Sequence, residues 1–263
     1  MVPSESPAGR LRVLVTRPAG DAADTLCAAI GAAGHQAYSQ PLLVLSPLPQ
    51  LPAAQRQYIL QLDLYQHVIL ISANAVRFGL PLLQDYWVQL PTGLHWYAIG
   101  AATAAGLERF GVKALTPGNI MSSEGLLALP ALQWVAQQRV LIIKGEGGRD
   151  TLATELGRRG AAVDELACYR RSLPTFHPGE VATKLGRWAI DVIMLSSGEG
   201  LANLQVLLSP AETTKLKHVG LIVPSPRVAH MAQAAGFGRI VIADNASDAA
   251  MLRALQQSLA RDR

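Results

Sequence analysis

Short apolar runs rich in β-branched residues alternate with Ala- and Leu-rich segments of helical period along almost the whole chain. Seven runs have the length and composition of buried strands: Arg12–Thr16, Val68–Ile71, Trp96–Ile99, Val140–Ile143, Val192–Leu195, Leu221–Val223 and Ile240–Ala243. Continuous apolar strands separated by helices are typical of a parallel sheet that is covered on both faces. The pattern therefore predicts an α/β fold built from doubly wound parallel sheets.

The two halves of the chain repeat each other at a nearly constant offset. The run VILIS at Val68–Ser72 matches VIMLS at Val192–Ser196, 124 residues later. Upstream, VLVTR at Val13–Arg17 matches VLIIK at Val140–Lys144, at an offset of 127 residues. Chance matches between apolar strands do not keep a register, so the repeat indicates an internal duplication. A length of 263 residues also suits two domains of ordinary size.

Two segments lack a helical pattern and are rich in Pro, Ser or Thr, namely Tyr38–Pro52 and Tyr169–Pro178. Because they occupy similar places in the two repeats, we interpret them as linkers or crossovers. Two arrangements then stay open. The repeats fold as consecutive domains, or the chain crosses over at each linker, so that each domain combines the start of one repeat with the remainder of the other.

The composition narrows the class of ligand. The net charge is +4, only 5% of the residues are aromatic, and no run of four Lys or Arg residues occurs. Nucleic-acid binding is therefore not expected, and a small acidic molecule fits better. No apolar stretch is long enough to span a membrane, and residues 1–10 read as a disordered tail without a signal peptide, so we expect a cytoplasmic protein. Cys27 and Cys168 lie too far apart in sequence to imply a disulfide framework or a zinc site.

The candidate site follows the strands. Ligands of open parallel sheets bind beyond the carboxyl ends of the strands, where helices present free amides. The residues at these strand ends are small, hydroxylated, amidic or basic. The candidate substrate-binding residues are Arg17, Ser72, Asn74, Gly100, Thr103, Lys144, Gly145, Ser196, Ser197, Ser225 and Arg227. Taken singly, each of them is better explained as a helix cap, but together they favour an anion-binding cleft.

Several familiar motifs are absent. No GxGxxG, GxxxxGK[ST] or GxSxG sequence occurs, and the glycine-rich stretch at Gly145–Gly148 carries a glutamate that suits a phosphate poorly. Asp164 and Glu165 are adjacent in a predicted strand and so point to opposite faces. No nucleophile–base couple and no metal-ligand spacing is visible. We therefore expect chemistry without a cofactor or a metal.

Taken in order, the strand ends resemble those of the uroporphyrinogen-III synthase family. The motifs that carry the resemblance are VLVTRP at Val13–Pro18, SANAV at Ser72–Val76, AIGAAT at Ala98–Thr103, KGEGGRDTLATELGRRGAAVDELACY at Lys144–Tyr169, LSS at Leu195–Ser197 and PSPRVAHMAQAAGF at Pro224–Phe237. Their order and spacing extend over nearly the whole chain from Leu11 onward. Many members of the family carry Thr at the last strand end, where this chain has Ser225. The role of the strand end Ser225–Arg227 is therefore left open.

The resemblance implies the crossed-over arrangement of two flavodoxin-like domains. One would combine 11–37 with 178–263, the other would span 50–165, and 38–49 and 166–177 would form a two-stranded ladder between them. It also implies a reaction: hydroxymethylbilane, a linear tetrapyrrole with eight carboxylates, loses its hydroxyl, inverts its last pyrrole ring through a spiro intermediate and closes to uroporphyrinogen III. Without the enzyme, the same substrate closes to the type I isomer.

The resemblance further implies a role for Tyr169, which matches the tyrosine suspected of supplying the proton to the departing hydroxyl. A reactive substrate needs mainly folding and proton donation, which explains why no catalytic constellation is visible. We expect a monomer that makes at most transient contact with the enzyme that produces hydroxymethylbilane.

Two rival functions remain from the residues alone. A non-catalytic protein that binds a small anion between two lobes is the principal alternative, and it differs by lacking turnover. A sugar-nucleotide transferase with two doubly wound lobes is the other, although such enzymes normally have longer chains.

Overall fold

The structure, a computed structural model, describes residues 10–118 and 120–261. The disordered tail predicted for residues 1–10 lies outside this part of the chain, except for Arg10. The chain divides into two compact units. Unit 1 contains the residues up to Val44 together with those from Ser172 onward, and unit 2 contains Leu45–Arg171. Unit 1 is thus discontinuous in sequence.

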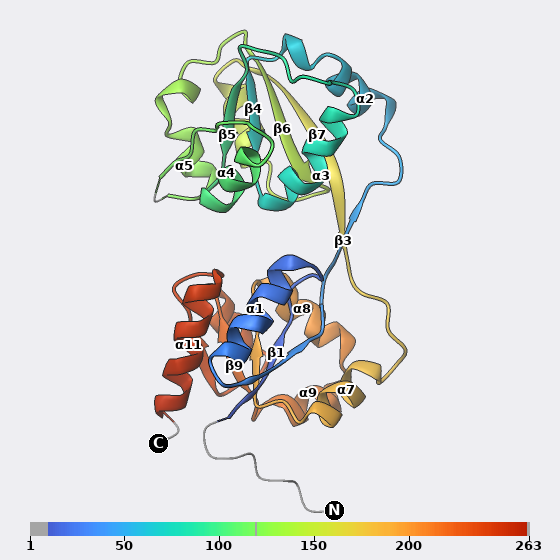
Figure 1. Ribbon diagram of the computed structural model, residues 1–263, viewed down its shortest axis with the longest axis vertical. Coiled ribbons are helices and arrows are strands. Elements are labelled where there is room, and N and C mark those ends of the chain that lie inside the picture. Colours follow the sequence, from blue (N-terminus) through green and yellow to red (C-terminus); the bar gives the residue numbers. More distant parts are fainter. Residues whose placement is uncertain (1–9, 119, 262–263) are drawn as a thin grey trace, which may run out of the picture. The chain divides into compact units, whose positions relative to one another are not determined.

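Unit 1 is a five-stranded parallel sheet with helices on both faces (Figure 1). Its chain order is β1 (Arg12–Val15), α1 (Asp21–Ala32), β2 (Gln36–Ser39), α7 (Glu180–Trp188), β8 (Val192–Met194), α8 (Gly198–Leu207), α9 (Pro210–Leu216), β9 (Gly220–Val223), α10 (Pro226–Ala234), β10 (Ile240–Ile242) and α11 (Asp248–Arg261). The strands lie in the order β10-β9-β8-β1-β2. The order reverses direction between β1 and β8, which is the switch point at which such sheets bind ligands.

Unit 2 has a second sheet, ordered β3-β7-β6-β4-β5. Its chain order is β3 (Val44–Pro47), α2 (Ala53–Leu60), the 3₁₀ helix η1 (Leu62–Leu64), β4 (His67–Leu70), α3 (Ala73–Gln84), β5 (His95–Ala98), α4 (Ala101–Glu108), α5 (Ser123–Leu127), the 3₁₀ helix η2 (Pro130–Leu132), β6 (Arg139–Gly145), α6 (Thr151–Arg158) and β7 (Ala162–Ser172). Strands β7, β6, β4 and β5 are parallel. The switch point here lies between β4 and β6.

The repeat found in the sequence corresponds to equivalent positions in the two sheets. The matched runs align β4 with β8 and β6 with β1, and the two matched strands of each unit are direct neighbours in their sheet. The next strands, β5 and β9, correspond as well. Leu115, which forms a parallel bridge to Tyr97 of β5, stands where β10 pairs with β9. The predicted fold of two doubly wound parallel sheets is confirmed, and the topology supports the duplication.

Each sheet is covered by two apolar layers. In unit 1, α1 and α11 pack side by side on one face around Leu26 and Met251, as Figure 1 shows, while α7, α8 and α10 cover the other. In unit 2, α3 and α4 cover one face, and α5, η2 and α6 cover the other around Leu126 and Leu156. The strands are apolar on both sides because both of their faces are buried. None of the helices in the described part of the chain combines the length and the apolar character needed to cross a membrane.

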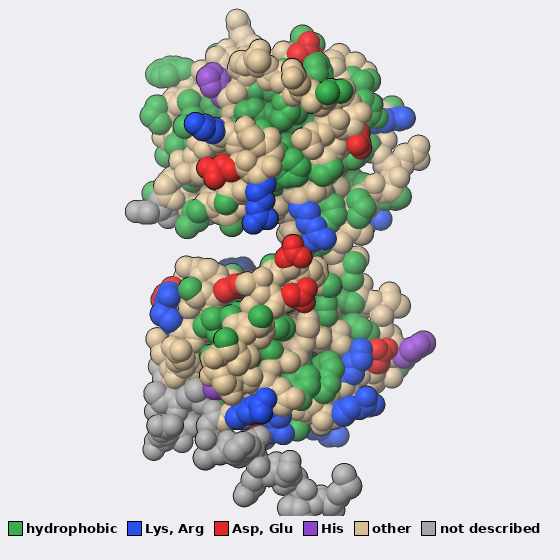
Figure 2. Space-filling view, viewed as in Figure 1, with side chains coloured by type: hydrophobic (Ala, Val, Ile, Leu, Met, Phe, Trp, Pro, Cys, Tyr) green, Lys and Arg blue, Asp and Glu red, His purple; other side chains and the backbone are tan. Residues whose placement is uncertain are grey.

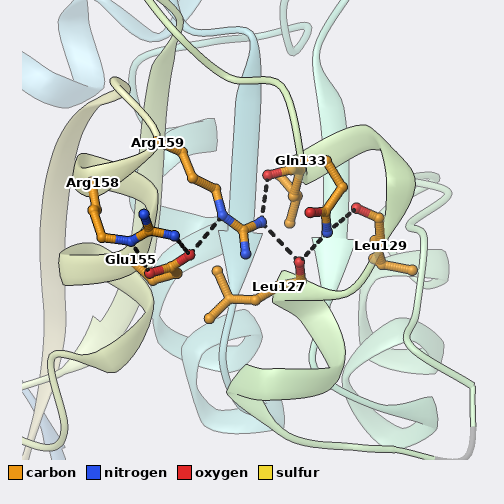
Figure 3. A network of polar contacts seen from close by, with 7 residues as sticks. Leu127, Leu129, Gln133, Glu155, Arg158 and Arg159 are labelled. Carbon is orange, nitrogen blue, oxygen red and sulfur yellow. Dashed lines mark hydrogen bonds and ion pairs between the residues drawn. The ribbon is translucent and has the colours of Figure 1, made fainter.

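A polar network joins the helices on the second face of unit 2 (Figure 3). Arg159 donates hydrogen bonds of 2.8 Å to the carbonyl oxygens of Leu127 and Leu132, and its Nε lies 2.9 Å from Glu155. Glu155 also accepts two hydrogen bonds of 2.8 Å from Arg158. Carbonyls at the end of α5 and in η2 are thereby satisfied by a side chain that is tied to α6.

This network predicts an acid-sensitive contribution to stability. Hydrogen bonds from Arg158 and Arg159 lower the pKa of Glu155 from 4.5 to about 2. A carboxyl whose pKa is lowered on folding stabilises the fold above its ordinary pKa and ceases to do so as the pH falls from about 4.5 to about 2. Glu155→Gln is therefore expected to unfold at a lower temperature than the parent at pH 7, with the difference closing in acid. A difference between the two melting temperatures that does not change with pH would contradict this assignment.

Candidate functional site

The carboxyl edge of each sheet carries serines that begin the following helices. Ser72 accepts a hydrogen bond of 2.9 Å from the amide of Ala75 at the start of α3. In unit 1, Ser197 begins α8 and Ser225 begins α10, and their hydroxyls accept from amides at 3.1 and 3.4 Å. The capping interpretation is thus right for these three residues. A capping oxygen still has its own O–H to donate, and other first-turn amides still point outward, so these edges can also bind an anion.

Asn74, Gly100 and Thr103 complete the edge of unit 2. Gly100 is the residue that precedes α4, and Thr103 lies in the first turn of that helix with 3% of its surface exposed. Asn74 is half-buried in the first turn of α3. The structure therefore brings them to the ends of the neighbouring strands β4 and β5, as predicted.

Arg17 is held within unit 1 by several partners. Its guanidinium forms an ion pair with Asp248 at the start of α11. It also donates to the hydroxyl of Ser196 at 3.2 Å and to the carbonyl of Ala246 at 2.5 Å. Only 11% of the side chain is exposed. The structure brings Arg17 and Ser196 together at the switch point, but it also shows that Asp248 neutralises much of the charge of Arg17.

Lys144 lies apart from the other candidates of unit 2. Its ammonium is 2.7 Å from Glu165 and 3.5 Å from Asp150, and 8% of its side chain is exposed. Along β6, Ile142 belongs to the layer beneath α5 and α6, so alternation places Lys144 on that same face. Gly145 and Tyr169 lie on the opposite face. Lys144 is thus a buried, paired cation on the α5 and α6 side of the sheet.

Tyr169 lies on the α3 side of β7, next to the serine that begins α3. Its phenol oxygen is 3.3 Å from the Ser72 hydroxyl, and its ring stacks on Phe78 with the centroids 5.3 Å apart. The residue is 5% exposed. The sequence pattern placed Tyr169 at the start of a linker segment, whereas β7 continues through it to Ser172. The adjacent Cys168 is no candidate nucleophile, because burial raises the pKa of its thiol to about 12.

The remaining predicted residue, Arg227, is exposed on α10, where its guanidinium contacts the sulfur of Met231 at 3.6 Å. On the face drawn in Figure 2, lysine and arginine side chains lie scattered among acidic and apolar ones. Within the described ranges, no group of three or more His, Cys, Asp and Glu side chains is arranged to hold a metal.

Sequence reasoning missed three partners in these sites. Asp248 pairs with Arg17, Glu165 pairs with Lys144, and Phe78 stacks on Tyr169. Asp248 is the first residue of α11, and its partner lies 231 positions away in the chain, so no local pattern reveals the pairing. The prediction that Asp164 and Glu165 face opposite ways is confirmed, since Asp164 binds Tyr65 and Arg139 instead.

Comparison with known proteins gives consistent matches over both units. A family model described as Uroporphyrinogen-III synthase HemD matches residues 24–253. The uroporphyrinogen-III synthase of Escherichia coli K12 is 36% identical over 253 residues, which cover 94% of this chain and 100% of that protein. That of Salmonella typhimurium LT2 is 34% identical over 250 residues, covering 94% and 100%. A solved structure of a mutant uroporphyrinogen III synthase from Thermus thermophilus has a TM-score of 0.62 at 18% identity, covering 95% of this chain and 99% of that one, and it supports the fold.

Proposed function

This chain belongs to the uroporphyrinogen-III synthase family, and we propose that it acts as a lyase that converts hydroxymethylbilane into uroporphyrinogen III. The reaction removes water, inverts the last pyrrole ring and closes the macrocycle. We expect no cofactor to take part, because the hydroxyl of the substrate's hydroxymethyl group leaves readily as water once it is protonated.

The observation that carries the proposal is that the carboxyl edge of each sheet, taken separately, carries hydrogen-bond donors. Ser72, Ser197 and Ser225 each stand where a strand ends and a helix begins, beside first-turn amides. Hydroxyls and helix N-termini are suited to carboxylates, and the substrate carries eight of them. Binding spread over many neutral donors also fits a chain with no run of four Lys or Arg residues.

Tyr169 is the candidate acid in the chemical step. The phenol of Tyr169, beside the Ser72 hydroxyl, can donate its proton to the departing oxygen of the substrate. The C–O bond then breaks with its electron pair on oxygen, and the Tyr169 proton completes the water. The lone pair of the pyrrole nitrogen stabilises the positive charge left on the carbon. The proton lost when the rings close balances the one that Tyr169 gave, so the phenol is restored without a co-reactant.

The test is turnover of freshly prepared hydroxymethylbilane with separation of the type I and type III products. We expect the substrate to disappear faster with the protein than without it, and type III to dominate. Binding of the substrate without faster disappearance would favour a non-catalytic anion-binding protein instead.

If many donors share the binding of the substrate, replacing a single serine should weaken substrate binding only modestly. Ser197→Ala and Ser225→Ala should each raise KM about fivefold, because a neutral hydrogen bond contributes about 1 kcal/mol. Ser209, which begins α9 and forms a capping box with Glu212, is the matched control. It follows α8 at the end remote from the carboxyl edge, so Ser209→Ala should cost about 1 kcal/mol of stability and leave KM unchanged. Complete loss of activity from either edge variant would argue for a few dominant contacts.

A further inference from the structure

Strand β7 contains a bulge immediately before Tyr169. The register between β6 and β7 runs from Arg139 opposite Ala162 to Lys144 opposite Ala167. It then shifts by one residue, so that Gly145 lies opposite Tyr169 and Cys168 is the extra residue. In a regular strand, neighbouring side chains point to opposite faces, yet Cys168 and Tyr169 both belong to the apolar layer beneath α3. The bulge therefore turns Tyr169 to the face on which Ser72 lies.

The glycine opposite this bulge leaves the space that the tyrosine ring fills. A Cβ atom built on Gly145 would lie 2.6 Å from Cζ and 2.8 Å from Cε2 of Tyr169. Both distances are well inside van der Waals contact. Gly145 is not among the glycines with positive φ, so the backbone there does not require glycine for its conformation. A glycine is needed at position 145 because any side chain there would overlap the Tyr169 ring.

The ring is also held by its other neighbours. Phe78 stacks on it at 5.3 Å between centroids with 25° between the planes, and the phenol meets the Ser72 hydroxyl at 3.3 Å. The main chain is fixed as well, because the carbonyl of Tyr169 accepts a 2.8 Å hydrogen bond from the amide of Glu146. With the residue 5% exposed, displacing the ring requires these neighbours to move.

We propose that Gly145 is a positioning residue, which together with the bulge aims the Tyr169 phenol at the carboxyl edge of unit 2. This rests on the proposed function, in which Tyr169 donates the proton. It also gives Gly145, the last residue of β6 and the first of the glycine-rich stretch, a role that the sequence did not suggest. The glycine serves the packing of an aromatic acid and not the binding of a phosphate.

The first test is Gly145→Ala. A methyl group there forces the ring away, and an error of about 1 Å in a reacting group can cost about a hundredfold in rate. We expect kcat to fall by about fivefold or more, without exceeding the loss in Tyr169→Phe, while KM stays within about twofold. Gly157→Ala on α6 is the matched control, because its Cβ would meet no atom within 4 Å, and it should keep the parent kcat.

A double-mutant cycle separates positioning from general damage. If Gly145 acts through the phenol, Gly145→Ala should cost less than about twofold once Tyr169 is already Phe. An equal loss in both backgrounds, or parent kcat in Gly145→Ala, would overturn the proposal even though the wild-type protein still makes type III product. Should Gly145→Ala fail to fold, Phe78→Leu loosens the same ring from another side and should follow the same cycle; independence from Tyr169 would again overturn the proposal.

A readout without substrate keeps this inference distinct from the proposed function. In protein labelled with ¹³C-tyrosine, the resonance that Tyr169→Phe removes identifies Tyr169. That resonance should shift in Gly145→Ala and stay in place in Gly157→Ala. An unmoved Tyr169 resonance in folded Gly145→Ala would show that the methyl group does not displace the ring. If the resonance shifts but the wild-type protein makes no type III product, the proposed function is wrong and the packing of Tyr169 against Gly145 still holds.

Discussion

Tyr169→Phe is expected to lower turnover by about ten- to a thousandfold, which is the lower range of general-acid effects, because the substrate ionises readily by itself. The substitution keeps the ring, its stacking on Phe78 and its place opposite Gly145, and removes only the phenol oxygen. The folded structure should therefore persist. Because the slower enzyme competes less well with spontaneous closure, the share of type I product should rise. Turnover and product isomers are measured in the same assay.

Tyr97→Phe is the matched control for that substitution. Tyr97 is fully buried in the same unit, and its hydroxyl lies 2.9 Å from Nδ1 of His67, the first residue of β4 and hence at the amino edge of the sheet. Losing this hydrogen bond should cost about 1 kcal/mol of stability without changing the product isomers. If folded Tyr169→Phe keeps the parent rate and isomer ratio, Tyr169 is only a core aromatic residue.

Glu165→Ala should destabilise the protein by about 2–3 kcal/mol, because it leaves a buried ammonium without its nearest partner. Glu165 lies 2.7 Å from Lys144, and Asp150 at 3.5 Å is the weaker substitute. We expect a smaller loss of stability than for a fully buried ion pair, because 35% of the Glu165 side chain is exposed. The measurement is the free energy of unfolding in urea.

The neighbouring pair of Glu146 and Arg170 supplies the comparison. It joins β7 to the residue that follows β6, at 2.5 Å, but 54% of the arginine side chain is exposed. Glu146→Ala should thus cost clearly less stability than Glu165→Ala, because solvent screens an exposed ion pair. A Lys144→Met, Glu165→Leu double variant should regain much of the stability lost in Glu165→Ala, since an apolar pair can replace a buried ion pair. Equal losses from Glu165→Ala and Glu146→Ala would show that Lys144 is well solvated.

The sequence predicted the central strands of both sheets because each is a short, continuous apolar run. The repeat also carried information about topology, since the matched runs Val68–Ser72 and Val192–Ser196 lead to strands at equivalent sheet positions. The edge strand β2 was not predicted as a strand. Its four residues, Gln36–Ser39, are only partly buried or exposed, so they lack the apolar signal.

The site was predicted less completely than the fold. Strand ends are visible in sequence, so Ser72, Ser197 and Ser225 were placed correctly at the starts of helices. The pairing of Arg17 with Asp248 joins residues far apart in the chain, and the type of residue alone does not reveal whether a cation is already neutralised. The bulge before Tyr169 depends on the register of two strands, which no local pattern specifies.

The most direct test of the proposed reaction follows the fate of the terminal pyrrole ring. Hydroxymethylbilane labelled with ¹³C in that ring is incubated with the protein, and the product is analysed by NMR. We expect the labelled ring to be inverted, as in uroporphyrinogen III, in nearly all of the product. Product in which the labelled ring keeps its orientation, at the rate seen without the protein, would contradict the assignment.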